Sequence, residues 1–172
     1  MLLSSSAQMK QIDNYAINHL NIPSTRLMEN AADGIVEAAA SVLNGNLSGK
    51  RICIFCGNGN NGGDGFCAAY KLIDLGASVT VYRLGNQNKM TDDAVEMLSR
   101  LSLRGCSALE VTDDFCISKY DFELIIDAIL GIGLNSPLRD TISSVVKKIN
   151  ASSIPVISAD ISTGLSADTG TV

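Results

Sequence analysis

The sequence predicts a doubly wound α/β domain, a three-layer αβα sandwich of the Rossmann-like type with a mostly parallel sheet. Short apolar runs alternate with segments of helical periodicity, which is the pattern of right-handed βαβ crossovers. A glycine cluster at 57–65 follows the first apolar run, at the strand-to-helix turn where such folds bind phosphates. Polar or glycine-rich segments also follow two later runs, and ligands bind beyond the carboxyl ends of strands in these sheets.

The composition fits one domain of this class, spanning residues 1–172. Of the 172 residues, 46% are hydrophobic and 18% are charged, which suits a compact α/β domain with a sizeable core. The net charge of −5 disfavours broad contact with nucleic acid or with an anionic membrane surface. We find no internal repeat, linker or low-complexity tract that would divide the sequence.

The N-terminal half follows the predicted alternation. Ser5 and Gln8 form a capping-box pattern ahead of helical apolar spacing that reaches Leu20. A second helix is predicted over 24–43, with Asn44-Gly45 as its stop signal. The almost wholly apolar run 51–56 predicts a strand covered on both faces. We then predict a helix over 66–75 and a strand over 77–82.

The C-terminal half continues in the same way. Thr91 is an N-cap candidate followed by two aspartates, so a helix is predicted over 91–104. A short strand is predicted at 108–111 and an apolar one at 123–128. A helix over 138–150 and a fifth strand over 155–159 complete the alternation.

The sequence carries no signal that predicts export or membrane insertion. The start lacks the basic and apolar regions of a signal peptide, and no apolar run approaches the ~20 residues of a membrane span. Cys53 and Cys56 form a C-x-x-C pattern, which raises a redox or metal motif as an alternative. Within a strand, however, residues three apart point to opposite faces, so we predict buried free thiols. These features favour the cytoplasm.

The glycine-rich segment formally matches G-x-G-x-x-G from Gly57 to Gly62, a weak signal alone. Asn60, Asn61 and Asp64 add amide and carboxylate groups to the turn, although an Asn/Gly-rich turn without function is the alternative. The second strand ends in Arg83, not in the acidic residue that holds a ribose in ordinary dinucleotide folds. We predict that Arg83 is solvated, and contact with a 2′-phosphate is the alternative.

Two aspartates end later strands. Asp127 either caps the turn that follows it or, beside Asn61, binds a cation through oxygen. Asp160 either forms an Asx turn or acts as a general acid and base. We expect the three loops to converge on one crevice. His19, the only histidine, lies far from these segments, so the sequence predicts no histidine-based mechanism.

Three motifs together resemble a known family. Gly57-Asn-Gly-Asn-Asn-Gly-Gly-Asp-Gly65, Asp127-Ala-Ile-Leu-Gly-Ile-Gly-Leu134 and Asp160-Ile-Ser-Thr-Gly-Leu165 with Asp168-Thr-Gly170 are similar to signatures of the YjeF N-terminal domain, the NAD(P)HX epimerases. Leu27-Met-Glu-Asn-Ala31 resembles the family as well. Ser162 stands where the family usually has proline, which implies a looser loop.

The resemblance implies cofactor repair: interconversion of the R and S hydrates of NADH and NADPH at C6 of the nicotinamide ring. It implies Asp160 as the catalytic residue, and potassium held by Asn61, Asp127 and Thr163. The substrate-binding residues it implies are Asn60, Asn61, Gly62, Gly63, Asp64, Gly131, Ile132, Gly133, Leu134, Asn135, Ser136, Pro137 and Asp160.

The resemblance also carries expectations about partners and alternatives. An S-specific NAD(P)HX dehydratase, separate or fused, is the expected partner, and the family often forms dimers. The family domain continues for several strands beyond the position of Val172. A non-catalytic nucleotide- or partner-binding domain of the same fold is the alternative. An NAD-dependent oxidoreductase is disfavoured by Arg83 and by the lack of a suitable His or Tyr-Lys arrangement near the strand ends.

Overall fold

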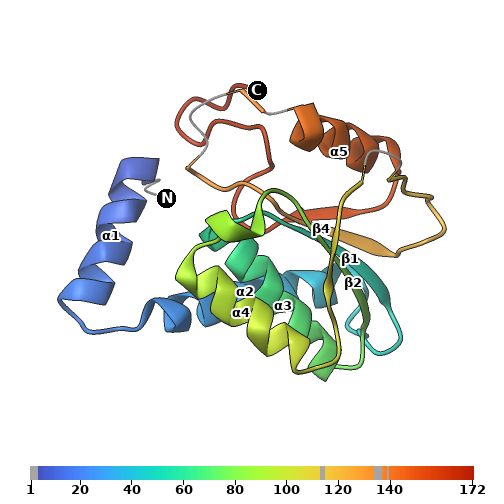
Figure 1. Cartoon of the computed structure of the whole chain (residues 1–172), viewed down its shortest axis with the longest axis horizontal. Coiled ribbons are helices and arrows are strands. Elements are labelled where there is room, and N and C mark those ends of the chain that lie inside the picture. The colour runs from blue at the N-terminus through green and yellow to red at the C-terminus, as the bar shows by residue number, and fades with distance from the viewer. Residues whose placement is uncertain (1–3, 113–114, 134–136, 139) are drawn as a thin grey trace.

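The computed structural model describes residues 4–112, 115–133, 137–138 and 140–172. Five parallel strands form one sheet with the order β3-β2-β1-β4-β5 (Figure 1). The strands are β1 (Arg51–Cys56), β2 (Ser78–Arg83), β3 (Ala108–Glu110), β4 (Leu124–Ala128) and β5 (Val156–Ser158). The helices are α1 (Ser6–Asn18), α2 (Ser24–Val42), α3 (Asn60–Asp74), the short 3-10 helix η1 (Gln87–Lys89), α4 (Asp92–Ser102) and α5 (Asp140–Ala151). The predicted fold class is confirmed.

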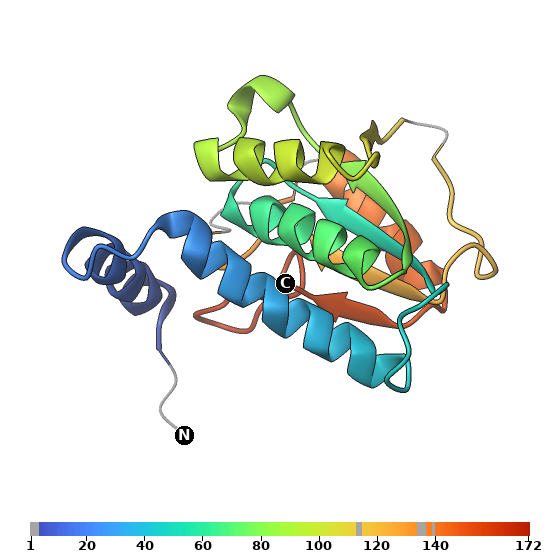
Figure 2. The same cartoon turned by 90° about the horizontal axis from the view of Figure 1, so that it is seen from below.

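Helices cover both faces of the sheet, which gives three layers. Helices α2, α3 and α4 lie side by side on one face, and α5 lies on the other (Figures 1 and 2). The chain reverses its winding between β1 and β4, so the topological switch point lies there. A ligand crevice is therefore expected where the loops after β1 and β4 meet.

The central strands are buried because they are apolar on both faces. In β1, Ile52, Ile54 and Cys56 pack under the three-helix layer, whereas Cys53 and Phe55 belong to the core on the α5 side. The prediction for the C-x-x-C pattern is confirmed: Cys53 and Cys56 are free, buried and on opposite faces. Burial raises the pKa of both thiols, which keeps them protonated.

An aromatic cluster covers the sheet face on the α5 side. The Phe55 ring stacks on Tyr82 with centroids 5.4 Å apart and meets the edge of Phe115 at 5.6 Å. Phe115 lies in the connection between β3 and β4, where the described residues form no helix. This connection therefore supplies apolar cover that a crossover helix would otherwise provide.

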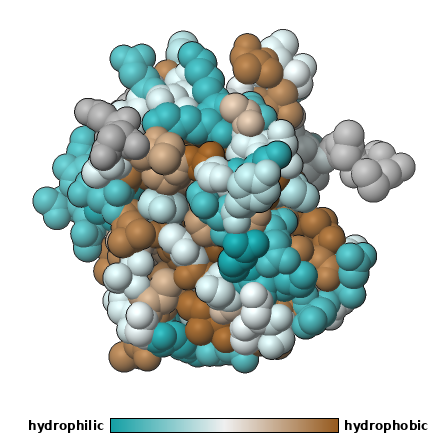
Figure 3. Space-filling model, turned by 90° about the vertical axis from the view of Figure 1, so that its right-hand side faces the viewer, coloured by the Kyte–Doolittle hydropathy of each residue, from teal (hydrophilic) through white to brown (hydrophobic). Residues whose placement is uncertain are grey.

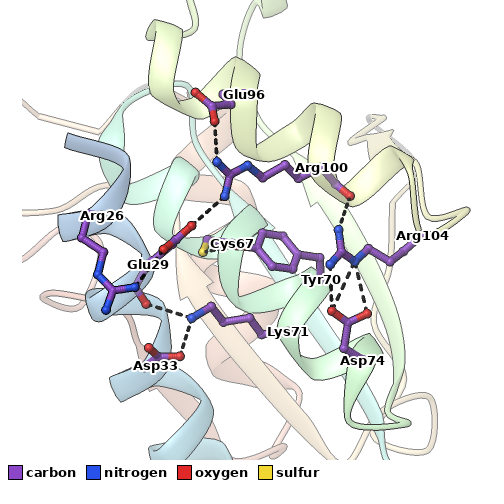
Figure 4. A network of polar contacts seen from close by, with 10 residues as sticks. All are labelled: Arg26, Glu29, Asp33, Cys67, Tyr70, Lys71, Asp74, Glu96, Arg100 and Arg104. Atoms are coloured by element: carbon purple, nitrogen blue, oxygen red, sulfur yellow. Dashed lines mark hydrogen bonds and ion pairs between the residues drawn. The ribbon is translucent and has the colours of Figure 1, made fainter. Parts of the chain in front are cut away.

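Polar contacts join the helices of the three-helix layer (Figure 4). Arg100 of α4 donates to Glu29 of α2 at 2.7 Å, and Lys71 of α3 pairs with Asp33 of α2. The Arg104 guanidinium lies 4.5 Å from the centre of the Tyr70 ring and also pairs with Asp74. Since α3 begins at the glycine-rich turn, these contacts hold that turn against α2 and α4.

Helix α1 stands apart from the three layers in both views (Figures 1 and 2). The predicted capping box is present, because the Ser5 hydroxyl accepts from the Gln8 backbone and the Gln8 side chain accepts from the Ser5 backbone. No residue of α1 is buried. Its start is held by Asp168, which accepts from the backbone and hydroxyl of Ser6. The 166–171 turn thereby anchors an otherwise peripheral helix.

Two sequence predictions were wrong. Helix α3 begins at Asn60, not at residue 66, because tight packing of its glycines overrides their poor helix propensity. Arg83 is not solvated: only 8% of it is exposed, since it points inward at the last position of β2.

Figure 3 shows one face on which hydrophobic residues are interspersed with hydrophilic ones. Among the residues that the structure describes, no helix combines the length and the apolar character needed to span a membrane.

Candidate functional site

Three glycines in the first turns of α3 leave no room for a side chain. A Cβ at Gly62 would lie 2.6 Å from the carbonyl carbon of Gly57, with the carbonyl oxygen closer still. A Cβ at Gly65 would lie 2.6 Å from the Ala128 Cβ, and one at Gly63 would lie 2.6 Å from the Met28 Cε. The glycines thus allow α3 to begin directly against the end of the sheet.

Close packing of the same kind joins the loops after β1 and β4. The Gly57 backbone donates to the Ala128 carbonyl at 3.0 Å. A Cβ at Gly57 would lie 3.0 Å from the carbonyl carbon of Ile129, with its oxygen closer. The loop that begins at Ile129 therefore runs beside the glycine-rich turn, as the switch point predicts.

Asp127 joins the loop after β4 to the loop after β5. The Thr163 hydroxyl donates to its Oδ1 at 2.7 Å, and the Thr163 backbone donates to its Oδ2 at 2.8 Å. The Ile129 backbone donates to Oδ1 at 3.2 Å, so Asp127 caps the turn that follows it, which is one of the two roles considered from the sequence. Only 6% of Asp127 and 7% of Thr163 is exposed. No cationic side chain pairs with this buried carboxylate among the described residues.

Asp160 lies against Gly131, at the point where the three loops meet. The Ile132 backbone donates to Asp160 Oδ2 at 2.8 Å. A Cβ at Gly131 would collide with Asp160 Oδ2 and would lie 3.4 Å from the Asn61 Cγ. The Asp160 carboxylate and the Asn61 amide therefore flank one backbone position, and only glycine fits between them.

The Asn61 amide is buried without a partner. Its Oδ1 and Nδ2 are both inaccessible, and neither makes a hydrogen bond with the described residues. An unpaired buried amide costs about 1–3 kcal/mol for each unsatisfied group. Such an amide, beside a carboxylate, can bind a ligand in two ways. Its Nδ2 can donate a hydrogen bond to an acceptor, and its Oδ1 can coordinate a cation.

The sequence also matches a known protein family. The model of the YjeF-related protein N-terminus matches residues 24–172, which include all three loops. The chain belongs to this family.

Relatives support the assignment across almost the whole chain. A protein from Oenococcus oeni named "NAD(P)H-hydrate epimerase" is 35% identical over 98% of this chain and 77% of its own length. One of the same name from Weissella koreensis is 31% identical over 96% of this chain and 72% of the relative. A "Bifunctional NAD(P)H-hydrate repair enzyme Nnr" from Moorella thermoacetica is 34% identical over 99% of this chain, but the match spans only 33% of that protein.

A solved structure gives the same fold. The crystal structure of yeast ynu0, YNL200c, superposes with a TM-score of 0.88 over 100% of this chain and 75% of the yeast chain. Its sequence identity of 24% supports the shared fold alone.

The structure brings most of the family's implied site residues to one edge of the sheet. Asn60 and Asn61 open α3, Gly131 and Ile132 lie on Asp160, and Thr163 binds Asp127. Gly62 and Gly63 are buried in packing, so only their backbone amides can serve a ligand. Leu134, Asn135 and Ser136 lie outside the described residues, and Pro137 is exposed.

Sequence reasoning missed Asn58, the second residue of the glycine-rich turn. Its Nδ2 donates to the Asn86 carbonyl at 2.9 Å, and its backbone carbonyl accepts from Thr91 at 3.0 Å. Its Oδ1 is buried without a partner among the described residues. No clear signal for this role is present in the sequence, because asparagine is common in turns for structural reasons alone.

The family motif in α2 also has a structural role that its sequence did not reveal. Met28 is 4% exposed and packs on Gly63, and Glu29 binds Arg100 of α4. Met28 therefore supports the start of α3, and Glu29 joins α2 to α4. No group of three or more His, Cys, Asp or Glu side chains forms a metal site within the described ranges.

The carboxyl group of Asp64 is expected to make the stability of the fold depend on pH. Burial, with a smaller contribution from the Asp160 charge, raises the pKa of Asp64 from 3.8 to about 7. The folded state then favours the protonated form. The stabilisation that this gives is complete below the unfolded pKa and is lost as the pH rises through about 7. We expect the wild type to lose about 2 kcal/mol of stability between pH 5 and pH 8.5, relative to Asp64→Asn.

Urea unfolding followed by circular dichroism, in buffer without potassium, measures this difference. Asp64→Asn mimics the protonated acid, so its stability should change less with pH. If the free energy of unfolding changes with pH in the same way in both proteins, ionising Asp64 does not destabilise the fold, contrary to the expectation.

Proposed function

We propose that this chain is an NAD(P)H-hydrate epimerase that interconverts the R and S hydrates of NADH and NADPH. The observation that carries the proposal is the pairing of the Asp160 carboxylate with the orphaned Asn61 amide across Gly131. A scaffold domain has no need for a buried unpaired amide at this place. The names of the full-length relatives support the same activity.

Asp160 is the proposed general acid and base. One of its oxygens is fixed by the Ile132 amide, which leaves the other available to the hydroxyl on C6. Protonated Asp160 gives its proton to that hydroxyl, which departs as water while the ring nitrogen donates electron density to C6. Water then adds to the opposite face of C6 and returns a proton to the Asp160 carboxylate, so the atoms and charges balance.

The substrate is proposed to lie in the crevice where 60–64, 131–133 and Asp160 come together. The exposed start of α3 offers backbone N–H groups and the positive end of the helix dipole to the pyrophosphate. The Asn61 Nδ2 would donate to the hydrated nicotinamide. Ring position then depends on the loop contacts between Gly131 and Asp160, which hold the reacting carbon near the acid.

We also propose a potassium site made by Asn61, Asp127 and Thr163. All three supply oxygen, which hard cations prefer, and the single carboxylate suits a monovalent ion. The residues fit: Asn61 Oδ1 is buried and unpaired, and the buried Asp127 has no cationic partner among the described residues. Bound there, potassium would supply positive charge beside the nucleotide and the acid.

Potassium is expected to stabilise the fold. Adding 100 mM KCl to a potassium-free sample should raise the unfolding temperature more than adding LiCl, because binding to the folded state shifts the equilibrium. Asn61→Ala should abolish the difference, whereas Asn60→Ala, an exposed neighbour, should keep it. Equal responses of the wild type to the two salts would contradict the site.

A coupled assay tests the activity. The chain is mixed with racemic NADPH hydrate and an S-specific dehydratase, and NADPH formation is followed at 340 nm. We expect complete conversion, because epimerisation supplies S from R. A burst that ends at about half of the substrate, followed by the spontaneous rate, would favour the non-catalytic alternative.

The biological setting follows from the same proposal. The bifunctional relatives suggest an S-specific dehydratase as the functional partner, fused or separate. A cytoplasmic location remains a prediction from the sequence, and a homodimer remains an expectation from the family resemblance. None of them is needed for the chemistry at Asp160.

A further inference from the structure

A cavity lies beside the candidate site, across the turn after β1. Its volume is about 510 Å³, within the range that small-molecule sites occupy. The carboxyl ends of β2 and β3, the 84–88 segment and Thr141 of α5 line it. Asp160 is not part of the lining, so this cavity is separate from the catalytic crevice.

The cavity and the catalytic crevice share the turn after β1. The Cys56 carbonyl accepts from the Leu84 backbone at 2.9 Å, and Asn58 reaches across to the Asn86 carbonyl. The crevice at Asp160 lies on the β4 and β5 side of this turn, and the cavity lies on the β2 and β3 side. A ligand that crosses the turn therefore reaches both.

Arg83 is the buried charge in the cavity wall. Its side chain is 9% exposed, and its Nη1 donates to the Gly85 carbonyl at 2.5 Å. The carboxylate of Glu110 lies 3.8 Å from Nη2, beyond hydrogen-bond distance, and the Glu110 side chain is 71% exposed. A guanidinium has five N–H donors, so this one is short of acceptors among the described residues.

We propose that this cavity holds the adenosine end of the hydrated dinucleotide, and that Arg83 binds the 2′-phosphate of the phosphorylated form. The inference rests on the proposed function. A dinucleotide crosses the switch point of a doubly wound sheet, so a nicotinamide ring at Asp160 leaves the adenosine end for the β2 side. In such folds, residues at the carboxyl end of β2 contact the adenosine ribose, and an arginine there can bind a 2′-phosphate.

Glu110 modulates the same site. Its charge partly neutralises Arg83 when no anion is bound, and it opposes the entry of a phosphate. Because most of its side chain is in solvent, it can turn away when the phosphate arrives. Removing its charge should therefore strengthen binding of a phosphorylated ligand, in the opposite direction to the loss of Arg83.

Isothermal calorimetry with 2′,5′-ADP and 5′-AMP tests the cavity without any catalysis. The wild-type chain should bind 2′,5′-ADP about 10- to 100-fold more tightly than 5′-AMP, because the 2′-phosphate gains charge-assisted hydrogen bonds. Arg83→Gln should remove most of this ratio, and Glu110→Gln should increase it. A ratio near one in the wild type, or an unchanged ratio in folded Arg83→Gln, would overturn the proposal.

Arg83→Gln places a shorter side chain in a buried position, so its folding is checked by circular dichroism. If Arg83→Gln does not fold, the wild type and Glu110→Gln test the proposal. The affinity for 2′,5′-ADP must then exceed that for 5′-AMP more than tenfold in the wild type, and this ratio must rise in Glu110→Gln. A ratio that stays level or falls in Glu110→Gln would then count against the proposal.

The coupled assay separates this inference from the proposed function. In an active chain, Arg83→Gln should raise the KM for NADPH hydrate at least tenfold and leave that for NADH hydrate nearly unchanged. If the chain is active but Arg83→Gln does not change its preference between NADPH hydrate and NADH hydrate, the adenosine site is refuted and the epimerase is not. Arg83-dependent binding of 2′,5′-ADP in an inactive chain would refute the epimerase and retain the site.

Discussion

Replacing Asp160 by asparagine is expected to lower the rate of epimerisation by about 10²–10⁴-fold, the range that general acid–base groups contribute. The amide oxygen of asparagine can still accept from the Ile132 backbone, so the loop contact is retained. The amide cannot deliver or take up the proton of the C6 hydroxyl. The loss should therefore appear in kcat, with a smaller change in KM.

Asp74→Asn is the matched control for this variant. Asp74 is the last residue of α3, at the opposite end of the helix from the crevice, and it pairs with Arg104. It should keep full activity. If Asp160→Asn keeps more than a tenth of the wild-type kcat in the coupled assay, Asp160 is not the general acid.

Gly62→Ala is expected to lower the free energy of unfolding by about 3 kcal/mol or more and to abolish epimerisation. The new Cβ would meet the backbone of Gly57, which hydrogen bonding to Ala128 holds in place. No side-chain rotation relieves this contact. The start of α3 must then move, which displaces Asn61 from Gly131 and Asp160.

Gly59→Ser is the control in the same turn. A Cβ at Gly59 meets nothing within 4 Å, and its extended backbone with φ of −91° is open to any residue. Serine is also a favoured N-cap, so stability should stay within about 0.5 kcal/mol of the wild type. Urea unfolding of the two variants measures the contrast. Equal stabilities would contradict the packing role of Gly62.

Much of the fold could be predicted from the sequence because the apolar residues of strands and of helices are spaced differently. The run 51–56 predicted a strand buried on both faces, and β1 has the same bounds. The start of α3 was wrong by six residues, because glycine and asparagine signal a turn by local propensity. The close fit of Gly62, Gly63 and Gly65 against the surrounding backbone and side chains favours a helix there, and a sequence does not display such contacts.

The candidate site was predictable in outline because the carboxyl ends of parallel strands share one edge. That rule places Asp127 and Asp160 together without any knowledge of the loops. The Thr163 bond to Asp127 and the fit of Gly131 between Asn61 and Asp160 depend on loop conformation. The exposure of Arg83 was predicted wrongly because its charge favoured a solvated position, whereas strand alternation places it on the buried face that Val81 also takes.

The most direct measurement follows inversion at C6 itself. Purified S hydrate of NADPH is incubated with the chain and, in parallel, with Asp160→Asn, and the two hydrates are separated by chromatography over time. Convergence of the three loops on Asp160 predicts that the wild type brings S and R to equilibrium far faster than buffer, whereas the variant lags well behind the wild type. If R appears at the spontaneous rate with the folded wild-type chain, the loops do not form an epimerase site.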